Sequence, residues 1–383
     1  MSATDISDPW RNLPPMMGIR IVVFAVGLSL VAWTLLSAIR TVVLPRGAQS
    51  AITRVVFRTF GRLFRMAAGA RPTFERQDRV MALFSPVSLL ALAVVWVILV
   101  DLGYMLMYWS VQQAGWAEAY FLSGSSLLTL GFAPAEGLTE RILAFSEATI
   151  GLGLVALLIA FLPAIYSSFQ RRERKVGELE VRAGSPPTAT EFLTRHHSIG
   201  WLEDMSGSWL DWEAWFLEIQ EAHTSYPALV FFRSPIPEQH WVTAAGTVLD
   251  AAALLVAVCD TGSQPEARVT IRAGWLALRR IASFFGIDFD PDPQPDDPIS
   301  IRRVEFDLVY DRLAEAGLPL VADRDQAWKD WAGWRVNYDS VLLQLAELTM
   351  APYAPWTSDR SSPGHTAPRI RRWGVRKQVR TSA

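Results

Sequence analysis

The sequence predicts a mainly α-helical membrane protein with three transmembrane helices, one re-entrant loop and a cytosolic, mainly α-helical domain. Three apolar runs are each long enough to cross a bilayer, which takes about 20 helical residues. A much shorter apolar segment lies between the second and third runs. A polar, tryptophan-rich region follows the third run, and this change in composition predicts a separate soluble domain.

The predicted parts follow one another along the chain in this order. They are an extracytoplasmic N-terminus (1–17), a transmembrane helix (18–44), a cytoplasmic arginine-rich amphipathic segment (45–81), an outer helix (82–109), the short helix with its loop (114–134), an inner helix (141–170), a linker (171–188), a cytosolic α-helical domain (189–356) and a flexible basic tail (357–383).

Composition supports a membrane protein with a large soluble part. Hydrophobic residues make up 51% of the 383 residues, and the mean hydropathy is +0.19. The net charge of −2 identifies no class of partner. Cys259 is the single cysteine, which excludes an intrachain disulfide and a zinc site built from cysteines.

The distribution of basic residues predicts the orientation in the membrane. Arginines crowd the connection after the first span, and Arg171, Arg172, Arg174 and Lys175 follow the third. The segment between the second and third spans is acidic instead. Because cytoplasmic loops carry the excess of Lys and Arg, we expect a multi-pass protein of the plasma (inner) membrane with its C-terminal domain in the cytoplasm.

Four arginines recur at helical spacing in the first connection: Arg54, Arg58, Arg62 and Arg65. Apolar residues fill much of the remaining helix surface, so we expect an amphipathic helix on the anionic inner leaflet. The alternative is a voltage sensor, but sensor arginines need a spanning helix and acidic partners, which this segment lacks. The basic tail has the same predicted partner, membrane lipid, and we expect no nucleic acid.

The short segment Tyr120–Ala133 is the centre of the functional prediction. It is too short to span, and irregular backbone survives at membrane depth only where it lines a protein-enclosed or watery cavity. Backbone carbonyls that replace an ion's hydration shell are the basis of ion filters. The run Thr129-Leu130-Gly131-Phe132 resembles the Thr-Val-Gly-Tyr/Phe of potassium-channel filters, and its position between two spanning helices is similar to that family's pore module.

The resemblance covers about residues 83–174 and implies a homotetramer that conducts K⁺ passively, with no enzymatic activity and no cofactor. Thr129, Leu130, Gly131, Phe132 and Ala133 would form the filter. Ala133 and Pro134 depart from the family's Gly-Asp, and Ala disfavours positive φ. The resemblance therefore leaves weak selectivity, with Na⁺ also permeating, as an alternative.

The inner helix carries Gly151, Gly153 and Pro163, which are kink positions because glycine lacks a side chain and proline removes a backbone hydrogen bond. The resemblance implies a gating hinge at Gly153 and a gate near Pro163. Glycine and proline are also common in membrane helices without such a role. Glu147 lies in the same span, where an acidic residue is costly, and it could support the filter.

The soluble region predicts helices at Trp241–Cys259, Arg268–Phe285, Ile301–Ala316 and Asp323–Met350. The first contains an Ala-rich apolar run with Asp250 in its middle and lies in a polar region, so we expect a buried helix of the soluble domain there rather than a further span. Ser208 and Asp211 could cap a further helix, and Leu229–Phe232 is a short strand candidate. The acidic loop between Asp288 and Asp297 could hold calcium, although it lacks the glycine and distal glutamate of an EF-hand. No nucleophile, base or metal-ligand arrangement can be argued from the sequence.

Two classes of function follow from these observations. The first is a potassium-channel-like cation channel, gated or assembled by its cytosolic domain. The second is a non-conducting, membrane-anchored scaffold or sensor that acts through the tryptophan-rich domain.

Overall fold

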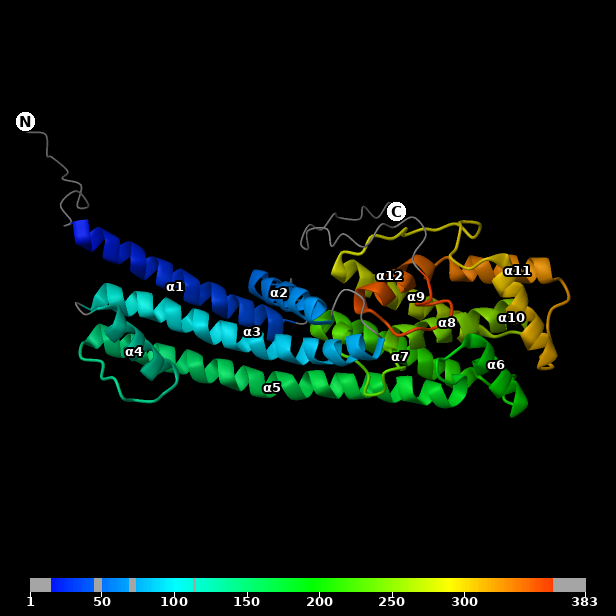
Figure 1. Cartoon of the computed structure of the whole chain (residues 1–383), viewed down its shortest axis with the longest axis horizontal. Helices are drawn as coiled ribbons and strands as arrows, with labels where there is room; N and C mark the ends of the chain where they lie inside the picture. The colour runs from blue at the N-terminus through cyan, green and yellow to red at the C-terminus, as the bar shows by residue number, and fades with distance from the viewer. Residues whose placement is uncertain (1–14, 45–49, 69–73, 113–114, 361–383) are drawn as a thin grey trace, which may run out of the picture. The chain divides into compact units, whose positions relative to one another are not determined.

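The computed structural model describes residues 15–44, 50–68, 74–112 and 115–360, and it confirms the mainly α-helical class. No strand occurs in these ranges (Figure 1). The helices are α1 Pro15–Val42, α2 Ala51–Ala68, α3 Phe74–Val111, α4 Trp116–Leu127, α5 Leu138–Ala183, α6 Ala189–Ser198, α7 Ser206–Ser225, η1 Pro227–Phe231, α8 Trp241–Val258, α9 Pro265–Phe285, α10 Arg303–Glu315, α11 Arg324–Arg335 and α12 Asp339–Thr349. Most of the predicted N-terminal segment (1–17) and of the basic tail (357–383) lies outside the described residues.

The chain divides into two compact units. Unit 1 comprises Met1–Arg62 and Val87–Ala164, and unit 2 comprises Leu63–Pro86 and Ile165–Ala383, each within its described residues. The boundaries between them fall inside α2, α3 and α5.

Among the described residues, four helices are long and apolar enough to cross a membrane: α1, α3, α5 and α8. In α1, α3 and α5 only 17–39% of the most apolar stretch is buried inside the protein. In α8 the share is 94%, so protein rather than solvent or lipid surrounds this helix. This burial agrees with the prediction that Trp241–Cys259 is a buried helix of the soluble region.

Close glycine contacts join α1 and α3 in unit 1. A side chain at Gly27 would overlap the carbonyl oxygen of Gly103, and one at Gly103 would overlap Val31. Small residues allow apolar helices to approach so closely. Hydrogen bonds also join these helices. Trp96 of α3 donates its indole N–H to the hydroxyl of Ser37 in α1 at 3.1 Å, and the Oγ atoms of Ser37 and Ser50 lie 2.6 Å apart.

The amphipathic character predicted for the first connection is present in α2. Ser50 caps the helix by accepting from the N–H of Thr53 at 3.1 Å. Ile52 and Val56 are buried. Of the four arginines, Arg54 is partly buried, whereas Arg58, Arg62 and Arg65 are exposed.

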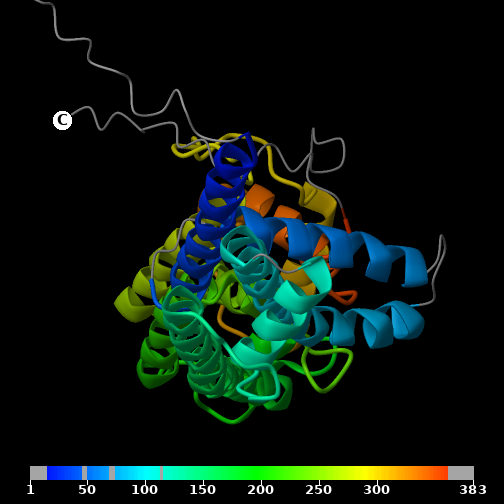
Figure 2. The same cartoon turned by 90° about the vertical axis from the view of Figure 1, so that its left-hand side faces the viewer.

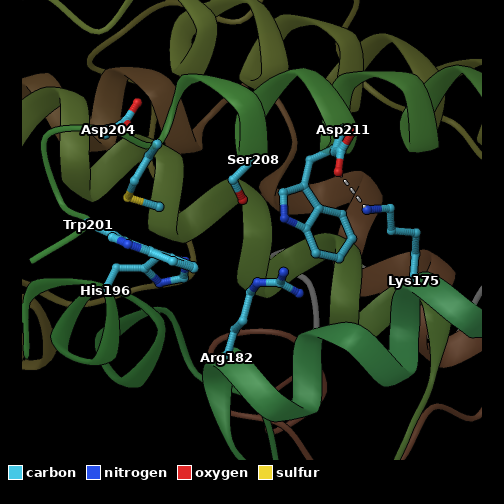
Figure 3. Close-up of a pocket in the computed structure, with 9 residues that line it drawn as sticks. Lys175, Arg182, His196, Trp201, Asp204, Ser208 and Asp211 are labelled. Carbon is cyan, nitrogen blue, oxygen red and sulfur yellow. Dashed lines mark hydrogen bonds and ion pairs between the residues drawn. The ribbon is translucent and has the colours of Figure 1, made fainter. Parts of the chain in front are cut away.

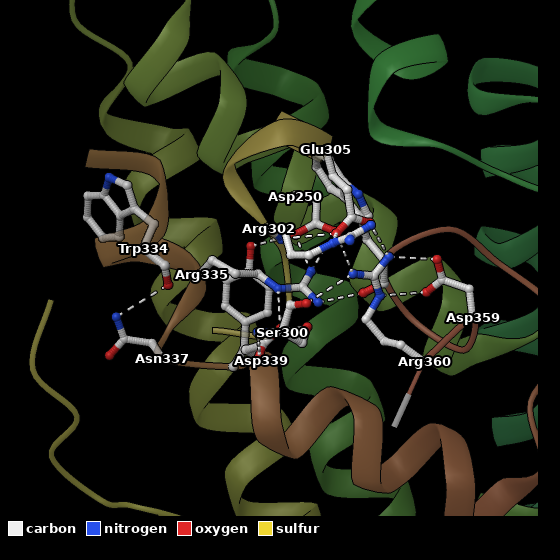
Figure 4. Close-up of polar contacts among 12 residues, drawn as sticks. Asp250, Ser300, Arg302, Glu305, Trp334, Arg335, Asn337, Asp339, Asp359 and Arg360 are labelled. Carbon is white, nitrogen blue, oxygen red and sulfur yellow. Dashed lines mark hydrogen bonds and ion pairs between the residues drawn. The ribbon is translucent and has the colours of Figure 1, made fainter. Parts of the chain in front are cut away.

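The core of unit 2 forms around α8, which packs against α6, α9, α11 and α12, while α7 packs against α9. Asp250 lies in the middle of α8, and its charge is balanced inside the core (Figure 4). Arg335 is fully buried and donates to Asp250 Oδ2 and to Asp339 Oδ1, both at 2.7 Å. Tyr338 also donates to Asp250, at 2.8 Å. A buried charge needs such partners to be tolerated.

The structure corrects three expectations for the soluble region. The strand candidate Leu229–Phe232 is wrong, because Pro227 opens a 3₁₀ helix there. The cap at Ser208 is wrong, because α7 already begins at Ser206 and has no side-chain cap. The helix expected at Asp323–Met350 is divided into α11 and α12. At the break, the side-chain amide of Asn337 donates to the carbonyls of Gly333 and Trp334, which would otherwise be free to continue the helix ladder.

The prediction of a linker at 171–188 is wrong for most of this range, because the helix α5 continues through Ala183. Glu178 pairs with Lys175 at 2.8 Å and contacts Arg182 at 3.9 Å, and such pairs stabilise a polar helix face. The apolar run therefore ends well before the helix does.

In the acidic loop, Asp290 and Asp297 accept backbone N–H groups of their own turn. No group of three or more metal-ligating side chains occurs in the described ranges.

Candidate functional site

The site begins with α4, which is followed by the predicted filter residues. Its buried face consists of Ala119, Leu122, Ser123, Ser125 and Leu127. Figures 1 and 2 show α4 beside α3 and α5. With its 12 residues α4 is too short to cross a bilayer, whereas both neighbours are long enough.

The end of α4 is a helix-terminating motif. Leu130 donates its N–H to the carbonyl of Ser125 at 2.8 Å, and Thr129 donates to that of Ser126 at 3.1 Å. This pair of bonds is the Schellman arrangement, whose left-handed residue is usually glycine. Here that residue is Thr129, with φ of 54°. A β-branched residue in this conformation is strained, so the surrounding structure must hold it there.

The loop after Thr129 is held by the side chain of Ser125, which is buried. Its hydroxyl accepts the N–H of Ala133 at 3.0 Å. Gly131 has φ of 73°, and Leu130 and Phe132 are both exposed. Ala133 is not among the described residues with positive φ, so the backbone here does not adopt the conformation that the family's glycine would favour.

The predicted hinge residues of α5 have different surroundings. Gly151 lies against the carbonyl oxygen of Leu127 at the end of α4, and a side chain at 151 would overlap it. Gly153 has no heavy atom within 4 Å of where its Cβ would stand. Pro163 is exposed inside α5, which continues on both sides of it. Gly151 therefore has a packing role, and the hinge stays a prediction.

Glu147 is fully buried behind α4. Its Oε1 accepts from Ser123 Oγ at 2.6 Å, and its Oε2 accepts from the Tyr108 hydroxyl at 3.0 Å. These bonds join α5 to α4 and α3, and no described hydrogen bond of Glu147 reaches Thr129–Ala133. A supporting role of Glu147 for the loop stays a prediction, and it would act through α4.

Ser123 also lies between two carboxyl groups, since its Oγ is 2.9 Å from Asp101 Oδ1. A hydroxyl has one hydrogen and can donate it to only one of them. Both contacts are attractive only when the other carboxyl carries a proton and donates it to Ser123. Asp101, Ser123, Glu147 and Tyr108 thus form one buried polar cluster, which we call the carboxyl cluster.

Sequence reasoning missed Ser123 and Ser125, although small polar residues in a short apolar helix were the available signal. Tyr108 is fully buried, because its hydroxyl has a carboxylate partner inside the unit. Trp109 and Trp116 stack on each other at 4.5 Å.

A single copy of unit 1 leaves the loop open, since Thr129, Leu130, Gly131 and Phe132 are all exposed. Exposed apolar side chains continue along the first turns of α5, at Leu138, Ile142 and Phe145. Lipid or another protein surface would have to cover such a patch.

Comparisons with protein-family models, curated proteins and solved structures found no match to this chain.

Proposed function

We propose that unit 1 is the pore module of a cation channel that conducts K⁺ passively. The observation that supports this best is the short helix α4, which lies beside two helices of spanning length and is followed by a loop that is hydrogen-bonded to Ser125 of α4. Thr129 and Gly131 both adopt positive φ in that loop. Carbonyls fixed in such a loop can replace water around a cation.

The proposed filter runs from Thr129 to Ala133. Ser125 is bonded to it at two places. Its carbonyl accepts the N–H of Leu130, and its hydroxyl accepts the N–H of Ala133. In a filter the backbone carbonyls replace the hydration shell of the ion, and these two hydrogen bonds help to set where the loop's backbone lies. Ala133 leaves the outermost ring without the family's glycine, so we propose a pore that admits Na⁺ more readily than the family norm.

The proposed assembly is a homotetramer around the loop. One loop cannot enclose an ion path, whereas four copies around an axis can. The exposed apolar residues Leu130, Phe132 and Phe145 would then be covered by neighbouring copies or by lipid. We propose α1, α3 and α5 as the spans, in the plasma (inner) membrane with unit 2 in the cytoplasm. The arginines of α2 would contact anionic lipid.

Flux measurements on the full chain in liposomes test the proposal. We expect K⁺ efflux that depends on the protein, together with a tetrameric mass in mild detergent by native mass spectrometry. A channel in which Gly131→Ala conducts like the wild type would contradict the filter assignment. A monomeric protein without flux would favour the membrane-anchored scaffold or sensor instead.

Protease protection tests the topology independently of conduction. Tags before Gly18 and after Trp356 should lie on opposite sides of the membrane, because the proposed number of spans is odd. Finding both tags on one side would contradict the three-span arrangement and, with it, the proposed pore.

A further inference from the structure

A cavity in unit 2 has the features of a small-molecule site. Its volume is about 360 Å³, within the range of about 300–1,000 Å³ typical of ligand pockets. Lys175 and Arg182 of α5, His196 of α6, and Trp201, Ser208 and Trp212 on or before α7 line it (Figure 3). All of these residues belong to unit 2, so the cavity does not depend on the proposed pore.

The cationic groups of the cavity differ in how far they are already neutralised. Lys175 contacts Glu178 at 2.8 Å and Asp211 at 3.1 Å, so its charge is balanced. Arg182 donates to a backbone carbonyl at 3.3 Å, and its nearest carboxylate, Glu178, is 3.9 Å away. Figure 3 shows Arg182 extending from α5 into the space between His196 and Lys175. Arg182 is therefore the cation of the cavity with the more distant carboxylate partner, and the carboxylate of a ligand could pair with it.

His196 adds a hydrogen-bond acceptor. It is 3% exposed, and its Nδ1 lies 2.7 Å from the carbonyl of Phe192. Since a carbonyl only accepts, Nδ1 carries the hydrogen, and the neutral ring offers Nε2 as an acceptor. Burial, the larger cause, and the nearby charge of Arg182 lower the pKa of His196 and favour this neutral form. No described hydrogen bond uses Nε2.

Trp201 supplies an exposed aromatic face, with 56% of its surface accessible. Such a face can stack on a planar ring. The lining also carries a negative charge, because Asp204 lines the cavity together with Trp201 (Figure 3). Asp204 is exposed, so solvent and salt screen its repulsion of an anion.

We propose that this cavity binds a small planar molecule that carries one carboxylate and one ring N–H. Arg182 pairs with the carboxylate, His196 accepts the ring N–H, and the ring stacks on Trp201. Arginine's planar fork can bind a carboxylate bidentately. The two acidic residues of the lining, Asp204 and Asp211, would repel a dianionic phosphate more strongly than a monoanion.

Calorimetric titration of the full chain in detergent with indole-3-acetate tests the proposal. We expect saturable binding, with indole and acetate, which each carry half of the features, binding at least tenfold more weakly. Phenyl phosphate should also bind more weakly. Equal binding of phenyl phosphate would overturn the carboxylate assignment, and absence of indole-3-acetate binding would overturn the site.

Variants separate the roles of the lining residues. Arg182→Gln and Trp201→Ala should each weaken indole-3-acetate binding at least tenfold, and Asp204→Asn should strengthen it about two- to threefold. Arg174→Gln is the matched control, because Arg174 lies on the same helix with its side chain 70% exposed and outside the cavity. Unchanged affinity of Arg182→Gln, with an unchanged melting temperature, would exclude the proposed ion pair. None of these outcomes bears on ion flux.

Discussion

Gly151 on α5 lies directly against the main-chain carbonyl of Leu127, at the last residue of α4. This contact fixes the distance between the long helix and the end of the short one. The loop with Thr129 and Gly131 starts only two residues beyond Leu127. The packing of α5 therefore determines where the loop begins.

Gly151→Ala should destabilise unit 1 by about 1–3 kcal/mol, because the added methyl forces α4 and α5 apart. Thermal unfolding in detergent, followed by circular dichroism, measures the effect. Gly153→Ala is the matched control: it makes the same change two residues away, where no atom lies within 4 Å, and should be neutral or slightly stabilising. Equal melting temperatures for both variants would show that the Leu127 contact does not limit the packing.

Gly131→Ala should abolish K⁺ flux while leaving expression and assembly intact. No atom lies within 4 Å of the added methyl, so the cost comes only from the positive φ, on the order of 1 kcal/mol. That cost is enough to rearrange an exposed loop but too small to unfold a helical unit. Gly137→Ala, also without neighbours and without positive φ, should conduct normally in the same liposome assay.

Glu147→Gln should be tolerated better than Glu147→Ala. Glutamine can still accept from Tyr108 and can donate its amide to Ser123, which replaces the proton that the carboxyl cluster requires. Alanine removes the carboxylate partner of the buried Tyr108 hydroxyl, at about 1–3 kcal/mol, while Ser123 keeps Asp101 as an acceptor. Melting temperatures in detergent compare the two variants. A glutamine variant as unstable as the alanine variant would mean that Glu147 must be ionised.

Unit 2 should lose stability as the pH falls below about 6.5 because of His223 and His240. Both are buried, and burial, followed by the charges of nearby arginines, holds the pKa of each ring well below 6.5. The unfolded chain takes up these protons near pH 6.5, whereas the folded chain does not. The free energy of unfolding therefore decreases as the pH falls, by up to about 1.4 kcal/mol per pH unit for each histidine.

Denaturant unfolding of His223→Gln between pH 7 and 5 measures this contribution. The variant should show a shallower pH dependence than the wild type, since glutamine does not titrate. His197→Gln is the control for the substitution itself, because it makes the same change at a histidine that is only partly buried. A wild-type slope that persists in His223→Gln would assign the pH dependence to other groups.

Arg335→Met should destabilise unit 2 by about 3–5 kcal/mol. The substitution leaves Asp250 and Asp339 buried near each other without their cation, and an uncompensated buried charge is strongly destabilising. Arg312→Met, on the exposed surface of α10, should change stability by less than about 0.5 kcal/mol. Chemical denaturation at pH 7 measures the free energy of unfolding of both variants. Equal values for the two would show that Arg335 does not stabilise unit 2 through Asp250 and Asp339.

The sequence by itself determined the features that local pattern controls. Long apolar runs predicted the helices of spanning length, and arginines at helical spacing predicted the amphipathic α2. The burial of α8 followed from an Ala-rich apolar run that carries Asp250 in its middle and lies in a polar region. These features depend on residues close together in the chain, so periodicity and composition are sufficient to find them.

Tertiary structure alone decided which distant groups meet. The sequence identified Glu147 as a costly acid but could not show that Ser123 lies between it and Asp101, because Ser123 is 24 residues from Glu147 and 22 from Asp101. Arg335 as the partner of Asp250 is 85 residues away. The end of α5 also escaped prediction, since hydropathy marks where an apolar run stops, whereas a helix ends where its backbone hydrogen bonds and side-chain pairs no longer continue.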